Sequence, residues 1–512
     1  MPYPQHVDEH HVIVNAMIML NSDNYYPGIL CYPSFPIYMT AAILKIGKFI
    51  DNVFIKSEPN SKFDLQKYPF YKEYIPVIFV KFFFCIIALF IPITLSIVTT
   101  RLCKSVFAGC LTFFFICMSE LFSYHSSHYV NIDLVATLFV SINIFFFVFF
   151  FNPNSFYKSV LIPGILTGFA IASKYPLGLI SIIYLLGFIF DKDIKMFHVL
   201  IKFTSIISIS IITTVILCPY IFIFFDTWLN DIIQQGKIYS NGWPGYTVES
   251  GTTNFTLQVK QIYNQYGFMF FTFFLIGILF FLVKKSLNGF FILFFCLIFI
   301  SYFSTYSVNL VRNLLSVYIL YALISSVGFF YLTTHINKHK HRILIYSALA
   351  LVTFLSLPQK KIERLISLEY ETRNVLYEYI KSFLPKGGKI YISKEIGLNI
   401  NKLDDYNVSE INFLNEDKKT LNPSIAKIAN SKDIFVYPIF CTDMRWPDGI
   451  HFANSINQSI NGLKSLLHIQ GRVGGSYSYI HLSRPGVQVN SSATSPWGNP
   501  SIIVTKGLET SF

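Results

Sequence analysis

Two adjacent carboxylates near the start of the sequence are the clearest candidates for chemistry in this chain. Asp8 and Glu9 lie in a histidine-rich run, upstream of Tyr32 and Pro33. An acidic pair beside a strongly apolar polypeptide is costly unless it has a use. A carboxylate held near a hydroxyl group can remove its proton as the oxygen forms a new bond, so we interpret Asp8 as a general base. The alternative is a solvated acidic N-terminus.

A second polar group surrounds the start of an apolar run near residue 130. Asp133 follows Glu120, His125 and His128 in the sequence. Asp133 could simply cap a helix, because an aspartate at that position satisfies free backbone amides. The histidines could be ordinary polar residues at a membrane boundary. The spacing of these side chains does not indicate a metal site.

Three cations stand out by position. Lys174 precedes Tyr175 and Pro176, Arg312 opens a late apolar run, and Lys81 lies inside the first long apolar run. Such side chains could merely extend along apolar surface toward water. The functional alternative is phosphate binding, because a phosphate leaving group needs fixed positive charge when no metal supplies it.

The composition predicts a membrane protein. Of 512 residues, 53% are hydrophobic and only 13% are charged, which is too apolar for a soluble globular protein. The formal net charge of +12 therefore indicates membrane orientation and not nucleic-acid binding. The scattered cysteines include no CxxC pair. We predict ten membrane helices, at about 75–99, 105–123, 130–151, 157–173, 176–190, 198–225, 266–283, 288–307, 311–334 and 343–358.

The charged connections orient these segments. Lysine and arginine clusters fall on alternate connections, at 101–104, 158, 192–202, 284–285 and 338–342, which predicts that this side is cytoplasmic. The candidate residues and a polar loop from Asp226 to Gly267 then lie on the opposite side. We divide the chain into a non-cytoplasmic acidic-motif and juxtamembrane region (1–74), a transmembrane domain (75–358) and a non-cytoplasmic soluble α/β domain (359–512). In the last domain we expect a helix over 362–384 and strands over 389–392, 433–440 and 501–505.

Five stretches in order resemble GT-C-type membrane glycosyltransferases, the group that includes protein O-mannosyltransferases and bacterial aminoarabinose transferases. They are listed here as they stand in the chain: Asp8-Glu9 with Tyr32-Pro33, Ser127-His128 with Asp133, Gly168-Phe169-Ala170 with Ser173-Lys174-Tyr175, Pro219-Tyr220, and Arg312. Similar short stretches, Glu371 to Lys389 and Asn499-Pro500, occur in the tail. Each motif is short, and their order makes the resemblance specific.

The resemblance implies an inverting sugar transfer from a polyprenyl-phosphate donor to a lipid, glycan or protein acceptor, without a nucleotide or other cofactor and usually without a metal. It places the chain in the plasma (inner) membrane, among membrane lipids, with its site facing away from the cytoplasm. The implied catalytic residues are Asp8, Glu9 and Asp133. The implied residues for the donor phosphate are Lys174, Arg312 and Lys81. Those for the acceptor or sugar are His128, Glu120 and Tyr32.

Two alternatives and one departure accompany this interpretation. An oligosaccharide transferase would favour a metal-binding acidic motif, and a transporter or flippase of a lipid-linked saccharide would favour charges near the bilayer midplane. The group normally has a membrane helix before the acidic pair, whereas Asp8 stands close to Met1. We expect upstream coding sequence, if translated, to supply that helix.

Overall fold

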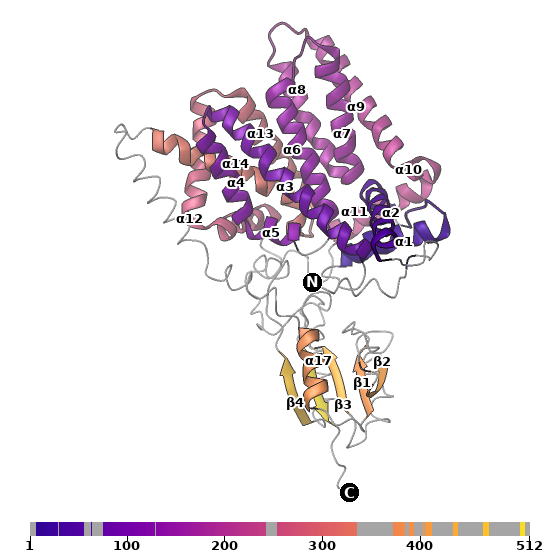
Figure 1. Cartoon of the computed structure of the whole chain (residues 1–512). Helices are drawn as coiled ribbons and strands as arrows, with labels where there is room; N and C mark the ends of the chain where they lie inside the picture. The colour runs from indigo at the N-terminus through magenta and orange to yellow at the C-terminus, as the bar shows by residue number, and fades with distance from the viewer. Residues whose placement is uncertain are drawn as a thin grey trace.

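The computed structural model is mostly helical, with a small sheet near the C-terminus (Figure 1). It describes residues 7–28, 30–55, 63, 75–127, 130–241, 253–334, 372–383, 389–393, 403, 405–411, 434–438, 464–469 and 502–506. The predicted fold class, a polytopic helical membrane protein with a C-terminal α/β unit, is confirmed for these residues.

The first half of the bundle contains α1 (Val7–Ser22), α2 (Phe35–Ile55), α3 (Ile75–Cys103), α4 (Val106–Met118), α5 (Glu120–Ser127), α6 (Ile132–Phe150), the π-helix η2 (Tyr157–Leu161), α7 (Ile162–Ser173), the 3₁₀ helix η3 (Tyr175–Ser181) and α8 (Ile182–Ile189). The second half contains α9 (Met196–Leu217), α10 (Tyr220–Ile223), α11 (Phe225–Asn241), α12 (Asn254–Val283), α13 (Leu287–Ser304), the 3₁₀ helix η4 (Val311–Leu314) and α14 (Leu315–Thr334).

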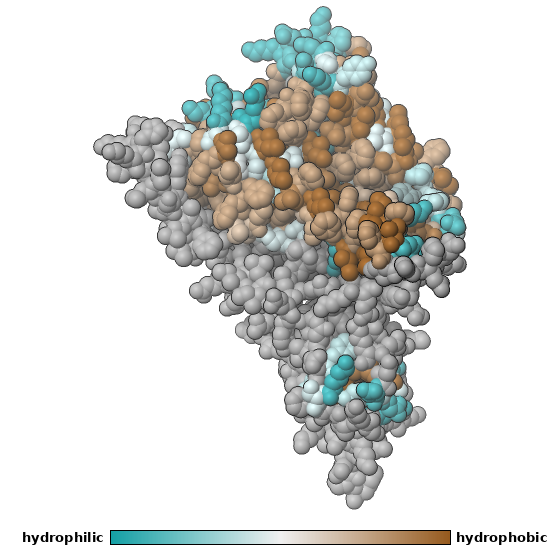
Figure 2. Space-filling view, viewed as in Figure 1, coloured by the Kyte–Doolittle hydropathy of each residue, from teal (hydrophilic) through white to brown (hydrophobic). Residues whose placement is uncertain are grey.

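Five of the described helices are long and apolar enough to cross a membrane, namely α3, α6, α9, α13 and α14 together with its η4 turn. Shorter apolar helices, including α4 and the η2–α7 and η3–α8 pairs, pack among them. Apolar side chains cover the visible face of the bundle, and hydrophilic ones gather at the end where α8 leads into α9 (Figure 2). Nine of the ten predicted segments correspond to helices, and the tenth, 343–358, lies outside the described residues.

Small residues let neighbouring helices approach closely. On α7, Gly164 and Gly168 face α9, where the Ser210 hydroxyl donates to the Gly164 carbonyl at 3.0 Å and Thr214 donates to the Gly168 carbonyl at 3.2 Å. A Cβ atom at Gly168 would lie 2.5 Å from the Cβ atom of Thr213. Because lipid offers no hydrophobic drive for helix association, such close contacts and interhelical hydrogen bonds stabilise the pair. They fix the end of α7, which carries Lys174.

The central helix α14 is held in the same way. Gly277 of α12 approaches the Ile324 carbonyl, and Gly328 of α14 approaches the Phe273 carbonyl, so that a Cβ atom at either glycine would overlap backbone. The side chains of α14 are buried along most of its length. The start of α14, next to Arg312, is therefore set by packing on several sides.

Two local predictions were wrong, and one alternative is excluded. The region from Asp226 to Gly267 is not a loop throughout, because it contains α11 and the first part of α12, which bends at Gly267 with φ 73°. The predicted segment 198–225 is interrupted, since α9 ends at Leu217 before Pro219. The alternative that Asp133 itself caps the helix does not hold, because the N-cap of α6 is Asn131, whose side chain accepts from the Asp133 amide.

The C-terminal unit contains α17 (Thr372–Phe383) and a five-stranded sheet in the order β2-β1-β3-β5-β4. The strands are β1 (Lys389–Ser393), β2 (Asn407–Ile411), β3 (Ile434–Pro438), β4 (Lys464–Ile469) and β5 (Ile502–Lys506). Strand β1 pairs parallel with β2 and β3, whereas β5 pairs antiparallel with β3 and β4. Leu376 and Ile380 of α17 pack with Ile390 and Ile392 of β1 in its core. The three predicted strands are present, and β2 and β4 were missed.

Candidate active site

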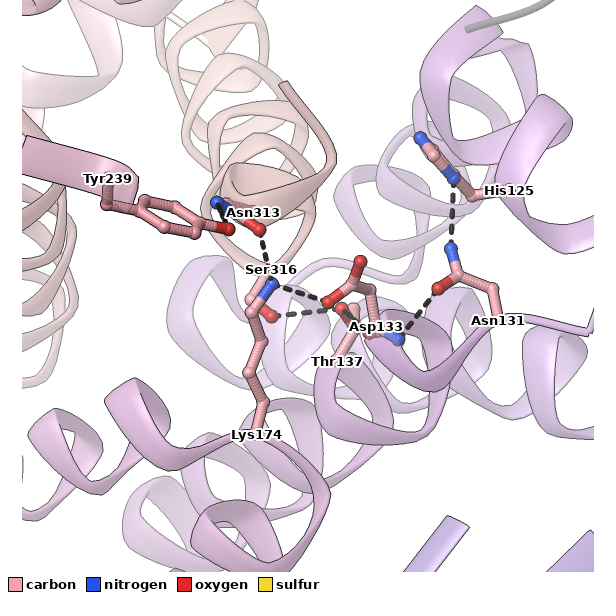
Figure 3. A network of polar contacts seen from close by, with 8 residues as sticks. All are labelled: His125, Asn131, Asp133, Thr137, Lys174, Tyr239, Asn313 and Ser316. Carbon is pink, nitrogen blue, oxygen red and sulfur yellow. Dashed lines mark hydrogen bonds and ion pairs between the residues drawn. The ribbon is translucent and has the colours of Figure 1, made fainter. Parts of the chain in front are cut away.

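The ends of three helical elements meet around one lysine. Lys174 follows the last residue of α7 with an extended backbone (φ −160°, ψ 115°), which separates α7 from η3. Its Nζ donates to Oδ1 of Asp133 at 2.5 Å and to Oδ1 of Asn313 at 3.0 Å (Figure 3). Asp133 lies in the first turn of α6, and Asn313 lies in η4 before α14. Residues 41 and 139 positions from Lys174 in sequence therefore hold one ammonium group.

The carboxylate of Asp133 is itself held in place. Its side chain is 5% exposed, and its amide donates to the Asn131 side chain at 2.8 Å. Asn131 in turn contacts the buried ring of His125 at 2.9 Å. One turn further along α6, Thr137 contacts Ser316 of α14 at 2.9 Å. These contacts hold the start of α6 and the start of α14 in place around the Asp133–Lys174 ion pair (Figure 3).

A tyrosine from α11 completes this network. The Asn313 side-chain amide donates to the Tyr239 hydroxyl at 3.1 Å. The backbone carbonyl of Tyr239 also accepts from the amides of Ser307 and Val308, at 3.0 and 3.1 Å. Burial raises the pKa of the Tyr239 phenol to about 12, although the hydrogen bonds from Asn313 and Gln235 lower it. The phenol is therefore neutral at physiological pH and docks α11 beside the lysine.

The loop between α1 and α2 lies against the same region. The Tyr175 hydroxyl, adjacent in sequence to Lys174, donates to the Leu30 carbonyl at 3.0 Å and accepts from the Trp228 indole at 3.1 Å. Burial raises the pKa of Tyr32, and Tyr239 and Asp133 lie near enough to raise it further. The loop carrying Tyr32 is thus held between η3 and the lysine network.

The other predicted site residues are placed as follows. Arg312, half-buried in η4, immediately precedes Asn313, and Lys81 lies half-buried in α3. Asp8 and Glu9 belong to the first turn of α1, and Glu120 begins α5, but their side chains lie outside the description. His128 is not among the described residues. The structure therefore brings together Asp133, Lys174 and the Tyr32 loop.

The network suits anion binding at Lys174. A lysine ammonium has three donors, and two of them are used by Asp133 and Asn313. The third has no hydrogen-bond partner among the described residues. The side chain is 14% exposed, so a ligand oxygen can reach it, and the two fixed acceptors hold it without reorganisation.

Metal ligation was tested on the same residues. Within the described part of the chain, no group of three histidine, cysteine or acidic side chains lies close enough together to hold a metal ion. The side chains of Asp8, Glu9, Glu120 and His128 do not belong to that part.

Sequence reasoning missed Asn313 and Tyr239. Asn313 had a usable signal, because it follows the singled-out Arg312 directly. Tyr239 had none, since it lies in a segment interpreted as loop and reaches the site only through the position of α11.

Part of the chain matches a known protein family. Residues 47–229 match the family described as dolichyl-phosphate-mannose-protein mannosyltransferase. The chain is similar to this family over about a third of its length. That match confirms the resemblance seen in the sequence motifs. The span includes Asp133 and Lys174 but neither Asp8 nor Arg312. The matched family consists of glycosyltransferases named for a lipid-phosphate sugar donor, and the apolar helices make this chain an integral multi-pass membrane protein.

The chain is similar to two solved structures at low identity. ArnT from Cupriavidus metallidurans, bound to undecaprenyl phosphate, is 10% identical with a TM-score of 0.44, covering 98% of this chain and 94% of that one. An Archaeoglobus fulgidus oligosaccharyltransferase in complex with Zn and sulfate is 12% identical with a TM-score of 0.44, covering 92% and 68%. At this similarity neither establishes a residue correspondence. No curated protein matches the sequence significantly.

Proposed function

We propose that this protein transfers a sugar from a polyprenyl-phosphate donor to an acceptor hydroxyl on the non-cytoplasmic side of the membrane, with inversion at the anomeric carbon. The donor class is supported by the family match over residues 47–229. The acceptor is a lipid, glycan or protein, and the membrane is the plasma (inner) membrane.

The observation that carries the proposal is the tethered ammonium of Lys174. It is fixed by Asp133 and Asn313, and its third donor has no partner among the residues that the structure describes. Charge develops on the phosphate oxygen as the sugar leaves, so a preorganised cation beside that oxygen lowers the barrier. Asp133 then positions Lys174 and neutralises the site before the donor arrives. Arg312 and Lys81 are proposed as further phosphate contacts.

The proposed reaction moves one proton and exchanges one bond at the anomeric carbon. Asp8 takes the proton of the acceptor hydroxyl, and the hydroxyl oxygen forms a bond to the anomeric carbon, while Glu9 shapes the acceptor or sugar site. The bond between that carbon and the phosphate oxygen breaks, and its electron pair leaves with polyprenyl phosphate. Tyr32, His128 and Glu120 are proposed to contact the acceptor or the sugar. The phenol of Tyr32 is neutral because burial raises its pKa.

The orientation is supported by the positions of helix ends. Asp133 opens α6, Lys174 ends α7 and Arg312 precedes α14, so these residues share one end of the bundle. The connections at the other ends of α6 to α9 carry Lys158, Lys192 and Lys195, as expected for the cytoplasmic side. This placement disfavours a transporter or flippase, whose charged site would lie near the bilayer midplane.

The test is transfer by purified protein in liposomes supplied with radiolabelled polyprenyl-phosphate sugars and a membrane extract as acceptor. We expect one sugar to pass to the acceptor with release of polyprenyl phosphate and inverted anomeric configuration. Lys174→Ala should weaken donor binding, whereas Lys158→Ala, at the opposite end, should not. If labelled donor crosses the bilayer with its sugar intact and none is transferred, the proposal is wrong and the transporter alternative holds.

A further inference from the structure

Helix α11 presents one row of side chains that could bind a sugar. Trp228, Asp231, Gln235 and Tyr239 are separated by three, four and four residues, so they lie on one face of the helix. All four are half-buried. The row therefore combines two aromatic rings with a carboxylate and an amide on one partly open surface.

Both ends of this row are fixed beside Lys174. At one end, the Trp228 indole donates to Tyr175, which is the next residue after Lys174. At the other end, Tyr239 accepts from Asn313, whose carbonyl oxygen binds the Lys174 ammonium. Figure 3 shows Tyr239 and Lys174 approaching Asn313 from different elements. The row thus runs alongside Lys174, from Tyr175 at one end to Asn313 at the other.

The two middle residues of the row, Asp231 and Gln235, have hydrogen-bonding groups that a ligand can use. Asp231 has no hydrogen-bond or ion-pair partner among the described residues. It nevertheless lies close to the loop between α1 and α2: the pKa of the Cys31 thiol is raised to about 11, first by burial and then by the Asp231 carboxylate. Gln235 contacts Tyr239. Asp231 is thus a half-buried hydrogen-bond acceptor that a ligand hydroxyl can reach.

An adjacent face of α11 is apolar and exposed. Phe225, Leu229 and Ile233 are 50%, 39% and 46% exposed, and they follow one another at four-residue spacing. Amphipathic helices with such a row lie in the membrane interface. Asp231 and Gln235, both half-buried, lie on the neighbouring, protein-facing side of the helix.

We propose that the row Trp228, Asp231, Gln235 and Tyr239 binds the hydroxyl-bearing sugar of the donor. The inference rests on the proposed function. A sugar joined to a phosphate held by Lys174 is one phosphate oxygen away, so it must lie beside the elements that flank this lysine. Asp231 accepts hydrogen bonds from sugar hydroxyls, and Gln235 can both donate and accept. The aromatic rings at the ends supply apolar surface with polar edges.

The test compares binding of a sugar-bearing polyprenyl phosphate with binding of bare polyprenyl phosphate to the full-length protein. Asp231→Ala and Gln235→Ala should weaken binding of the sugar-bearing lipid, with Asp231→Ala costing roughly tenfold or more, and should leave the bare lipid unchanged. Lys174→Ala should weaken both. Asp226→Ala removes an exposed carboxylate from the same helix and is the matched control. Unchanged thermal midpoints show that the variants fold.

Several outcomes overturn the inference. Equal losses for the two lipids would mean that Asp231 only supports the phosphate site. No loss for either lipid, or a change confined to the KM for acceptor, would remove the row from the donor sugar. Failure of the proposed function looks different, because the unmodified protein would then transfer no sugar from any donor in the panel.

Discussion

The ion pair between Lys174 and Asp133 allows stability and donor binding to be separated. Lys174→Met leaves the Asp133 carboxylate, on a side chain that is 5% exposed, without its cation. Breaking a buried pair by removing one partner costs about 3–5 kcal/mol, because the remaining charge is uncompensated. Adding Asp133→Asn removes that charge, so the double variant should recover part of the loss, with a coupling of roughly 1–3 kcal/mol.

The assay is thermal unfolding of the purified protein in detergent, combined with donor binding. At about 2.1 cal/mol/K per residue, a chain of 512 residues unfolds with an entropy of roughly 1 kcal/mol/K. The single variant should therefore lower Tm by about 3–5 °C, and the double variant by less. Lys158→Met, which removes an exposed cation, should stay within about 0.5 kcal/mol of the parent protein.

Donor binding should not follow stability. The double variant is expected to remain defective in binding polyprenyl phosphate, because the ammonium that would meet the phosphate is still missing. Strictly additive losses of stability would refute the energetic account of the ion pair. Recovery of both stability and binding in the double variant would show that Lys174 is structural and does not contact the donor.

Three further predictions follow from other parts of the molecule. Asp8→Asn should reduce turnover by roughly 10²–10⁴-fold while donor binding persists, and near-normal turnover would assign the base elsewhere. Gly168→Leu should lower Tm in the same unfolding assay, because its side chain would meet α9, whereas an unchanged Tm would contradict the close packing. Cys31 has a raised pKa of about 11, so less of it is thiolate at pH 8, and maleimide should label it roughly tenfold to hundredfold more slowly than a free peptide thiol. Its labelling should accelerate as pH rises and in Asp231→Asn, and a rate independent of both would argue against that environment.

Much of the architecture follows from local composition. Long apolar runs are unstable in water, and in lipid they must satisfy their backbone polar groups internally as helices, so the apolar helices between α3 and α14 could be located from hydropathy. Lysine-rich connections mark one side of the membrane. Their alternation along the chain therefore predicted that Asp133, Lys174 and Arg312 share the opposite side. Periodicity failed between Asp226 and Gly267. There α11 is amphipathic, and its polar composition resembles that of a loop.

The sequence alone determined which charged residues are unexpected in an apolar chain and which helix ends carry them. Only the tertiary structure decided their partners. The contact of Lys174 with Asp133 and Asn313 depends on how α7 packs on α9 through Gly164 and Gly168, and on how α14 is held in the bundle. Tyr239 joins the network because α11 docks on the segment before η4. Such contacts join residues far apart in sequence, and their geometry depends on side-chain packing between helices, which no local pattern of residues encodes.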